Sequence, residues 1–289
     1  MPIDWIQIDQ KRQSLGKAPY DPQLKAELEH EVADILGISQ SDRESPWGAA
    51  VGYGCRSLAL IAPNGAVQHK FSKHGAVQVK VFQGRGKPGK AKDFLRYHGT
   101  DFPQLESLRN PRIQQSIQAG SFKSVVHYAV LSYHPGALLR DFLDAPTVLP
   151  KAEALEILLD LFKAVWIPLW ASGLRFKDCH PGNFILTPDK RIVMIDSEQM
   201  RKDLHELLET PTDWTQRDKH ELSAIKKLPK LLEAFTKKSG HRTPANAIKT
   251  MPVFQKWTES LAALGRDQAP QEVLLTTEGF LKGLFENDR

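Results

Sequence analysis

Apolar residues with helical spacing dominate the second half of the chain. Between Lys151 and Gly173 they recur at every third or fourth position, which predicts one long helix ended by Gly173 and kinked by Pro168. A short strand hairpin is predicted over 183–195, where two apolar runs flank a turn. Further helical patterns cover 205–209, 220–235, 253–264 and 272–285. This half is therefore expected to be mainly helical.

The first half shows strand patterns instead. Three antiparallel strands fit the Gly-rich and then apolar stretch 47–62, the alternating stretch 66–71 and the Val-rich stretch 76–82. Another strand is predicted over 125–133, whereas 93–118 has a partly helical pattern interrupted by prolines. An amphipathic pattern over 21–38 predicts a helix near the start. The chain thus divides into a helical extension (1–46), a sheet-rich segment (47–133) and a helical segment (134–289).

Composition narrows the class of protein. The 289 residues include 41% hydrophobic and 25% charged residues, which is typical of folded globular domains and excludes collagen and wholesale disorder. Two cysteines cannot form a disulfide framework, and no apolar run approaches the ~18 residues of a membrane span. The start of the chain has no pattern typical of a secretion signal. A cytoplasmic protein is expected.

The net charge of +5 adds little to this picture. A basic loop over 84–92 carries four lysines and arginines, which would attract an anionic acceptor such as a phosphorylated glycan, but a solvated loop is the preferred interpretation. It lacks the interleaved aromatic residues of a nucleic-acid surface, so no nucleic-acid partner is expected.

The richest chemistry lies between residues 173 and 200. Asp178 and Asn183 are five residues apart on a loop after the long helix, and Asp196 follows 13 residues later at the end of a strand. A hairpin would fold Asp196 back beside Asn183, and such converging oxygen atoms suit Mg²⁺. Asp178 would lie near enough to accept a proton from a hydroxyl group. Taken singly, each residue has an ordinary alternative role, as a turn cap, a strand start or a helix N-cap.

These residues resemble motifs of the protein kinase-like superfamily. KDCHPGNF (177–184) is similar to the catalytic loop of aminoglycoside and choline-type phosphotransferases, and IDSEQMRK (195–202) is similar to bacterial lipopolysaccharide-core kinases. The resemblance implies an α+β bilobal fold, with an antiparallel-sheet lobe and a mainly helical lobe. It also implies that Asp178 is the catalytic base and that Asn183 and Asp196 bind Mg²⁺. His180 is interpreted as a loop-packing residue.

The same resemblance directs attention to nucleotide contacts in the first half. Gly52 and Gly54 provide the Gly-x-Gly of a phosphate-approaching loop, although such a pair also occurs in simple tight turns. Lys80 is the preferred phosphate-binding lysine, with Lys70 and Lys73 as competitors.

The remaining nucleotide contacts are less clearly marked. The acid expected to pair with that lysine is either Asp101 or Glu106, and the sequence does not choose between them. Backbone groups of Ser132 to His134 are predicted to face the adenine edge.

Some positions depart from protein kinases. Phe176 stands where they have His, and Ser197 and Glu198 follow Asp196 in place of Phe-Gly. The prediction is therefore an ATP- and Mg²⁺-dependent kinase acting on a hydroxyl group, with a small molecule or glycan favoured as acceptor. An atypical Ser/Thr protein kinase and a pseudokinase scaffold are the alternatives. The 21–38 helix leaves room for a protein partner.

Overall fold

A computed structural model of the chain describes residues 48–53, 57–61, 77–83, 110–122, 126–172, 179–195, 221–264 and 268–286. From 48 to 83, and at residues 122 and 126, the description covers the backbone alone. The predicted helices at 21–38 and 205–209 and the predicted strand at 66–71 lie outside these ranges.

The chain divides into two compact units. The first comprises Met1–Pro103 and Gln114–His134, and the second comprises Gln104–Ile113 and Pro135–Arg289. The short segment before residue 114 thus belongs with the helical unit, although it precedes two strands of the other. The predicted limits 1–46, 47–133 and 134–289 remain a prediction.

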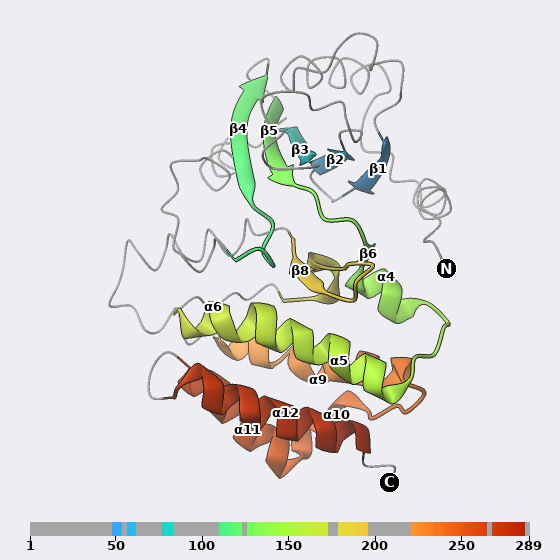
Figure 1. The fold of residues 1–289 in the computed structure, drawn as a ribbon, viewed down its shortest axis with the longest axis vertical. Coiled ribbons are helices and arrows are strands. Elements are labelled where there is room, and N and C mark those ends of the chain that lie inside the picture. Colours follow the sequence, from blue (N-terminus) through green and yellow to red (C-terminus); the bar gives the residue numbers. More distant parts are fainter. Residues whose placement is uncertain are drawn as a thin grey trace. The chain divides into compact units, whose positions relative to one another are not determined.

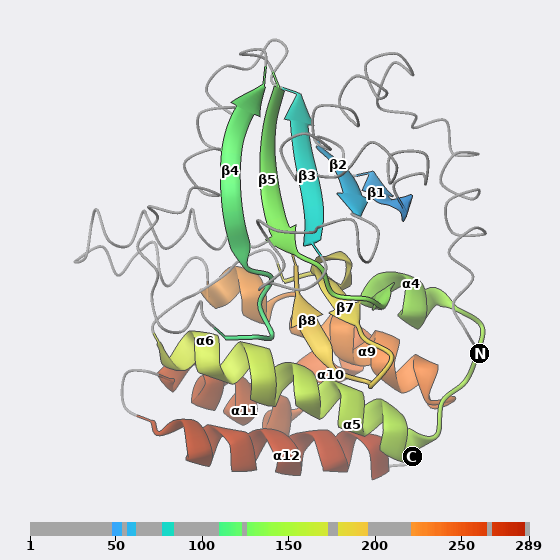
Figure 2. The same cartoon turned by 45° about the horizontal axis from the view of Figure 1, so that its top comes forward.

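The first unit contains a five-stranded antiparallel sheet in the order β1-β2-β3-β5-β4. Its strands are β1 (Gly48–Tyr53), β2 (Ser57–Ile61), β3 (Val77–Gln83), β4 (Ser116–Phe122) and β5 (Val126–Ser132). Figure 2 shows β3, β5 and β4 side by side along their length. The Val-rich pattern of β3 and the apolar run of β5 place both in the interior of the sheet, where each has a neighbour on either side.

Strand β4 begins at the end of the segment predicted to be partly helical: residues 116–118 are extended and pair with β5, whereas 93–109 lie outside the described residues. The strand pattern is weakened by Gly120, which has no side chain to alternate. Tyr128 on β5 occupies that space: a Cβ on Gly120 would lie only 2.5 Å from the Tyr128 hydroxyl oxygen. Gln118 Nε2 donates to the same hydroxyl at 3.2 Å. The aromatic ring of a neighbouring strand thus replaces the missing side chain.

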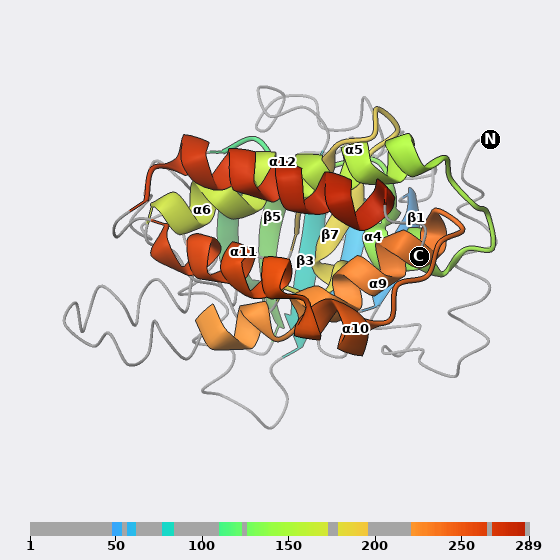
Figure 3. The same ribbon diagram turned by 90° about the horizontal axis from the view of Figure 1, so that it is seen from below.

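The second unit is mainly helical, with the small sheet β6-β7-β8 at one side. Its helices are α4 (Leu139–Asp144), α5 (Lys151–Leu161), α6 (Ile167–Ala171), α9 (Leu228–Lys238), α10 (Ala245–Thr250), α11 (Pro252–Ala263) and α12 (Pro270–Glu286). Helix α5 contacts both α9 and α12 (Figure 1), and α11 and α12 run side by side (Figure 3). In the described part of the chain, no helix is long and apolar enough to span a membrane.

The long helix predicted from Lys151 to Gly173 is divided into three parts. Between α5 and α6 lies a π-helical turn, η4 (Phe162–Trp166), and Pro168 stands in the first turn of α6. Proline has no backbone N–H, so it cannot donate to the carbonyl four residues before it, that of Ala164. The helix accommodates the proline with this wider turn, a device often found where a helix carries an additional contact.

Aromatic residues fill the core of the second unit. Trp257 on α11 is completely buried and stacks on Phe280 of α12, with ring centroids 4.5 Å apart. Phe162 meets the same indole edge-on at 5.2 Å. The indole N–H donates to Thr277 Oγ1 at 2.9 Å, so this large side chain is buried with its polar atom satisfied.

The small sheet consists of β6 (Ala137–Leu138), β7 (Phe184–Leu186) and β8 (Ile192–Met194). Gly136 precedes β6 with φ +152°, and a Cβ there would lie 2.3 Å from the carbonyl oxygen of Leu186. Only glycine permits this close approach of two backbones. The chain is thereby held against β7 just before α4 begins.

Candidate functional site

The β7–β8 hairpin brings the two ends of the predicted motif together. Phe184 pairs with Met194, and beyond that pair the Ile195 N–H donates to the Asn183 carbonyl at 2.8 Å. Asn183 is buried, with 6% of its surface exposed. The residue immediately before Asp196 is therefore hydrogen-bonded to Asn183, although the two are distant in sequence.

The loop before β7 is fixed by its own side chains. His180 caps the 3₁₀ turn η5 (Pro181–Asn183), since its Nδ1 accepts from the Gly182 N–H at 3.0 Å. The Asn183 N–H donates to the His180 carbonyl at 2.9 Å. A Cβ on Gly182 would lie 2.9 Å from the His180 ring, so a side chain at position 182 would displace the capping imidazole. The imidazole thus stabilises the loop, as its interpretation as a loop-packing residue suggests.

Asp178 and Asp196, the predicted base and the second predicted metal ligand, lie outside the described residues. Their sequence neighbours are described. Cys179 is buried with its Sγ 3.9 Å from the Ala224 carbonyl, and Ile195 is fixed to Asn183 as above. Within the ranges that the structure covers, no three His, Cys, Asp or Glu side chains gather to hold a metal ion.

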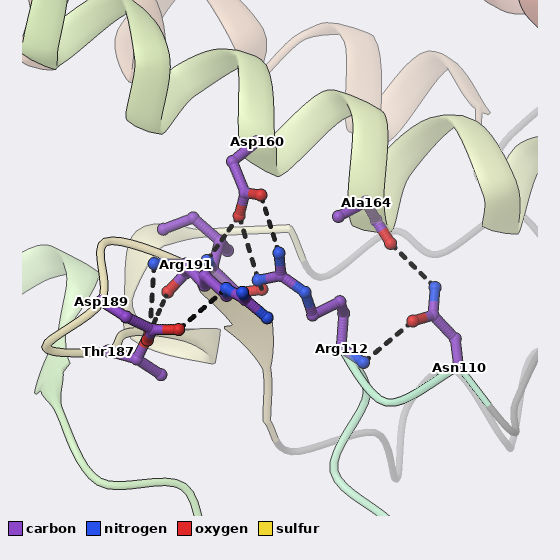
Figure 4. Close-up of polar contacts among 8 residues, drawn as sticks. Asn110, Arg112, Asp160, Ala164, Thr187, Asp189 and Arg191 are labelled. Carbon is purple, nitrogen blue, oxygen red and sulfur yellow. Dashed lines mark hydrogen bonds and ion pairs between the residues drawn. The ribbon is translucent and has the colours of Figure 1, made fainter.

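A polar cluster lies on the other edge of β8 (Figure 4). The Arg112 guanidinium forms two hydrogen bonds with the Asp160 carboxylate of α5, at 2.8 Å and 3.1 Å. Arg112 Nη1 also donates to the Ile192 carbonyl at 3.1 Å, and the Ile192 N–H donates to Asp160 Oδ2 at 2.7 Å. Met194 N–H donates to the Arg112 carbonyl at 2.8 Å. The edge of β8 that faces away from β7 is therefore hydrogen-bonded by the Arg112–Asp160 ion pair and by the Arg112 carbonyl.

Asn110, two residues before Arg112, provides a donor for the Ala164 carbonyl, which has no helix donor because Pro168 lacks an N–H. Asn110 Nδ2 donates to the Ala164 carbonyl at 2.8 Å, and Asn110 Oδ1 accepts from the Arg112 N–H at 2.8 Å (Figure 4). Sequence reasoning did not single out Asn110, Arg112 or Asp160 as site residues. Pro168 was the available indication, because a proline within a helix leaves a carbonyl that needs another donor.

In the first unit, two predicted nucleotide-binding residues share one row across the sheet. Gly52 on β1 pairs with Ala59 on β2, which pairs with Lys80 on β3. Strands lie about 4.8 Å apart, so the Gly52 and Lys80 backbones are separated by roughly 10 Å. Gly54, Asp101 and Glu106 lie outside the described residues.

Ser132, at the end of β5, is held by the two residues that precede β4. Its N–H donates to the Gln115 carbonyl at 2.9 Å, and its carbonyl accepts from Gln114 Nε2 at 2.9 Å. Its hydroxyl accepts from the Gln115 N–H at 2.9 Å and lies 3.0 Å from His134 Nε2. The hydroxyl hydrogen is therefore available to the imidazole, which fixes His134 against the strand.

The next two residues differ from Ser132 in their backbone contacts. Within the part of the chain that the structure describes, no hydrogen bond uses the backbone N–H or carbonyl of Tyr133 or His134. Burial raises the pKa of the Tyr133 phenol and lowers the pKa of His134. Both side chains are therefore neutral near pH 7.

We expect the chain to lose stability below neutral pH through the buried His127 and the half-buried His134. Burial lowers the pKa values of His127 and His134 below 6.5, so the unfolded chain binds more protons than the folded one as the pH falls past that value. The stability that the two neutral imidazoles contribute is complete above pH 6.5. It is lost as the pH falls towards their folded-state pKa values. The urea midpoint of wild type should therefore fall further between pH values of about 7.5 and 5.5 than that of a His127→Asn/His134→Asn variant. Equal falls in both proteins would contradict the assignment.

The architecture matches that of protein kinases. The kinase domain of PknI from Mycobacterium tuberculosis superposes with a TM-score of 0.50 at 15% sequence identity, covering 80% of this chain and 94% of that domain. No protein-family model matches the chain, and no curated protein matches it in sequence. The predicted α+β kinase-like fold is thereby confirmed. Membership of the atypical branch remains a prediction.

Proposed function

We propose that this chain transfers the γ-phosphate of ATP to a hydroxyl group, with Mg²⁺ as cofactor and a small molecule or glycan as acceptor. The observation that carries the proposal is the hydrogen bond between the Ile195 N–H and the Asn183 carbonyl, 2.8 Å long, in a chain with a kinase-like fold. It brings together the two chain segments that would supply the metal ligands.

The donor set fits Mg²⁺. Asn183 offers an amide oxygen from a buried position, and Asp196, which follows Ile195 directly, offers a carboxylate. Mg²⁺ prefers a few protein oxygens and completes its shell with water and phosphate oxygens. When bound, the ion would neutralise charge on the phosphates during transfer.

Asp178 would act on the acceptor. Its carboxylate would take the proton of the acceptor hydroxyl while that oxygen forms a bond to the γ-phosphorus and ADP leaves. The capped loop over residues 180–183 would hold this part of the chain in place, since the His180 imidazole fixes its turn. Positioning of this kind is the main contribution that phosphoryl transfer asks of a protein.

The first unit would bind the nucleotide. The proposal assigns the phosphates to Lys80 and to the glycines Gly52 and Gly54, with Asp101 or Glu106 pairing with the lysine. The adenine edge would meet the backbone of Tyr133 and His134, because the Ser132 N–H is already bonded to Gln115. The half-buried His134 ring, fixed by Ser132, would define one wall of that contact.

The test is turnover of labelled ATP by the purified chain with candidate acceptors and in a cell lysate. The proposal expects Mg²⁺-dependent label on low-mass species or glycans, reduced about 100-fold or more in Asp178→Asn, with ATP binding retained. Label on proteins would indicate an atypical protein kinase instead. Nucleotide binding with no Mg²⁺-dependent turnover would contradict the proposal and support a binding scaffold.

A further inference from the structure

Strand β8 carries the chain to Asp196, and its two edges are held by different groups. Alternate residues of a strand direct their backbone groups to opposite edges. Arg191 and Ile195 bond to Thr187 and Asn183 on the β7 side. Ile192 and Met194 therefore offer their backbone groups to the other edge.

At Ile192 that other edge is bonded by a side-chain pair, and at Met194 it forms an isolated parallel bridge with Ile113. Both backbone groups of Ile192 are bonded, the N–H to the Asp160 carboxylate and the carbonyl to the Arg112 guanidinium. The pair is mostly shielded from water, with side-chain exposures of 18% for Arg112 and 23% for Asp160. A paired guanidinium and carboxylate with four well-formed hydrogen bonds is a stiff arrangement, because the planar fork fixes the orientation of both groups.

The pair is itself anchored at two points on the long helix. Asp160 lies on α5, and Asn110 binds the Ala164 carbonyl in the π-helical turn that follows. The segment from Asn110 to Ile113 is thus attached to the helix at one end and to β8 at the other. Movement of β8 along the helix would have to break both sets of contacts.

We propose that Arg112 and Asp160 are positioning residues that set how tightly the Asn183–Asp196 pair binds its divalent cation. They act through β8, whose far end is hydrogen-bonded to Asn183 and leads into Asp196. The inference rests on the proposed function, since it concerns the same metal ligands. Residues that orient metal ligands commonly change metal affinity about 10- to 100-fold when replaced.

The chain provides a matched control in the same hairpin. Arg191 and Asp189 form an ion pair of 2.8 Å in the β7–β8 turn (Figure 4), with side-chain exposures of 62% and 60%. Asp189→Asn therefore makes the same chemical change as Asp160→Asn, in a pair that does not bond to the outer edge of β8. Arg112→Lys keeps the positive charge but removes the fork that reaches two acceptors at once.

The experiment measures Mn²⁺ binding by electron paramagnetic resonance in the presence of a non-hydrolysable ATP analogue. Mn²⁺ is used because it accepts the same oxygen ligands as Mg²⁺. Asp160→Asn and Arg112→Lys should weaken Mn²⁺ binding by about 10-fold or more, whereas Asp189→Asn should stay within about twofold of wild type. Affinity for the analogue without metal should be unchanged in all three variants.

Hydrogen exchange gives a readout that does not depend on the ligand. The Ile192 and Ile195 amides should exchange faster in Asp160→Asn than in Asp189→Asn. If Asp160→Asn does not fold, the charge-conserving Arg112→Lys variant decides the question. Equal Mn²⁺ affinity in Arg112→Lys and Asp189→Asn overturns the positioning role while leaving the proposed function intact. A wild-type protein that binds no Mn²⁺ with the analogue overturns both.

Discussion

Replacing Asn183 by alanine is expected to reduce Mg²⁺-dependent phosphate transfer by about 100- to 1,000-fold, the usual cost of removing one preorganised group that stabilises transition-state charge. The hairpin should survive the change, because the contact from Asn183 to Ile195 uses backbone atoms alone. Loss of activity would therefore report on the side chain and not on the strand pairing. Initial rates at several Mg²⁺ concentrations, together with a thermal unfolding curve, measure both effects.

Asp196→Ala is the companion to this variant. It should lose Mg²⁺-dependent turnover at least as completely, because it removes a charged ligand where Asn183 provides a neutral one. The double variant should be little worse than Asp196→Ala, since two ligands of one ion act together. Wild-type rates in either single variant would refute the metal assignment.

Replacing Trp257 by alanine is expected to destabilise the helical unit by about 3–5 kcal/mol, the range measured for truncating large buried aromatic residues. The indole is fully buried between Phe280 and Phe162, and the cavity left behind would have aromatic walls that cannot collapse easily. Chemical unfolding in urea measures the change in free energy. A loss below about 1 kcal/mol would mean that this cluster is not central to the core.

Trp257→Phe separates ring packing from hydrogen bonding. The smaller ring should keep most of the stacking on Phe280 but leaves Thr277 Oγ1 without the indole donor at 2.9 Å. Thr277 still donates to the Val273 carbonyl at 2.7 Å, so its hydroxyl keeps one hydrogen bond. We expect a loss of about 1–3 kcal/mol, intermediate between wild type and Trp257→Ala.

Features with local causes could be predicted from the sequence. The β7–β8 hairpin follows from two apolar runs around a turn-forming stretch, and the structure has strands at Phe184–Leu186 and Ile192–Met194. The last two helices were predicted within two residues of α11 (Pro252–Ala263) and α12 (Pro270–Glu286). In each case the pattern and the end residues lie within the element itself.

Features that depend on contacts between elements, or on a change of helix type, were missed. Strand β4 carries Gly120, and no strand pattern shows that the Tyr128 ring of the next strand will cover it. Pro168 predicts a kink in the long helix, but it does not predict that the kink takes the form of a π-helical turn. The acid on α5 that binds the outer edge of β8 is Asp160, and its partner Arg112 lies 48 residues earlier in the sequence. Spacing rules describe neighbours on one element and carry no information about such contacts.

The hydrogen bond from Asn110 to the Ala164 carbonyl, which Pro168 leaves without its helix donor, restricts which substitutions can accumulate at positions 110 and 168. The amide of Asn110 serves the Ala164 carbonyl that the proline leaves, so the two positions are expected to be inherited as a unit. Descendants that keep the proline should keep a donor at position 110. Lineages in which position 168 has an N–H would be released from that constraint, and position 110 would then need only an acceptor for the Arg112 N–H.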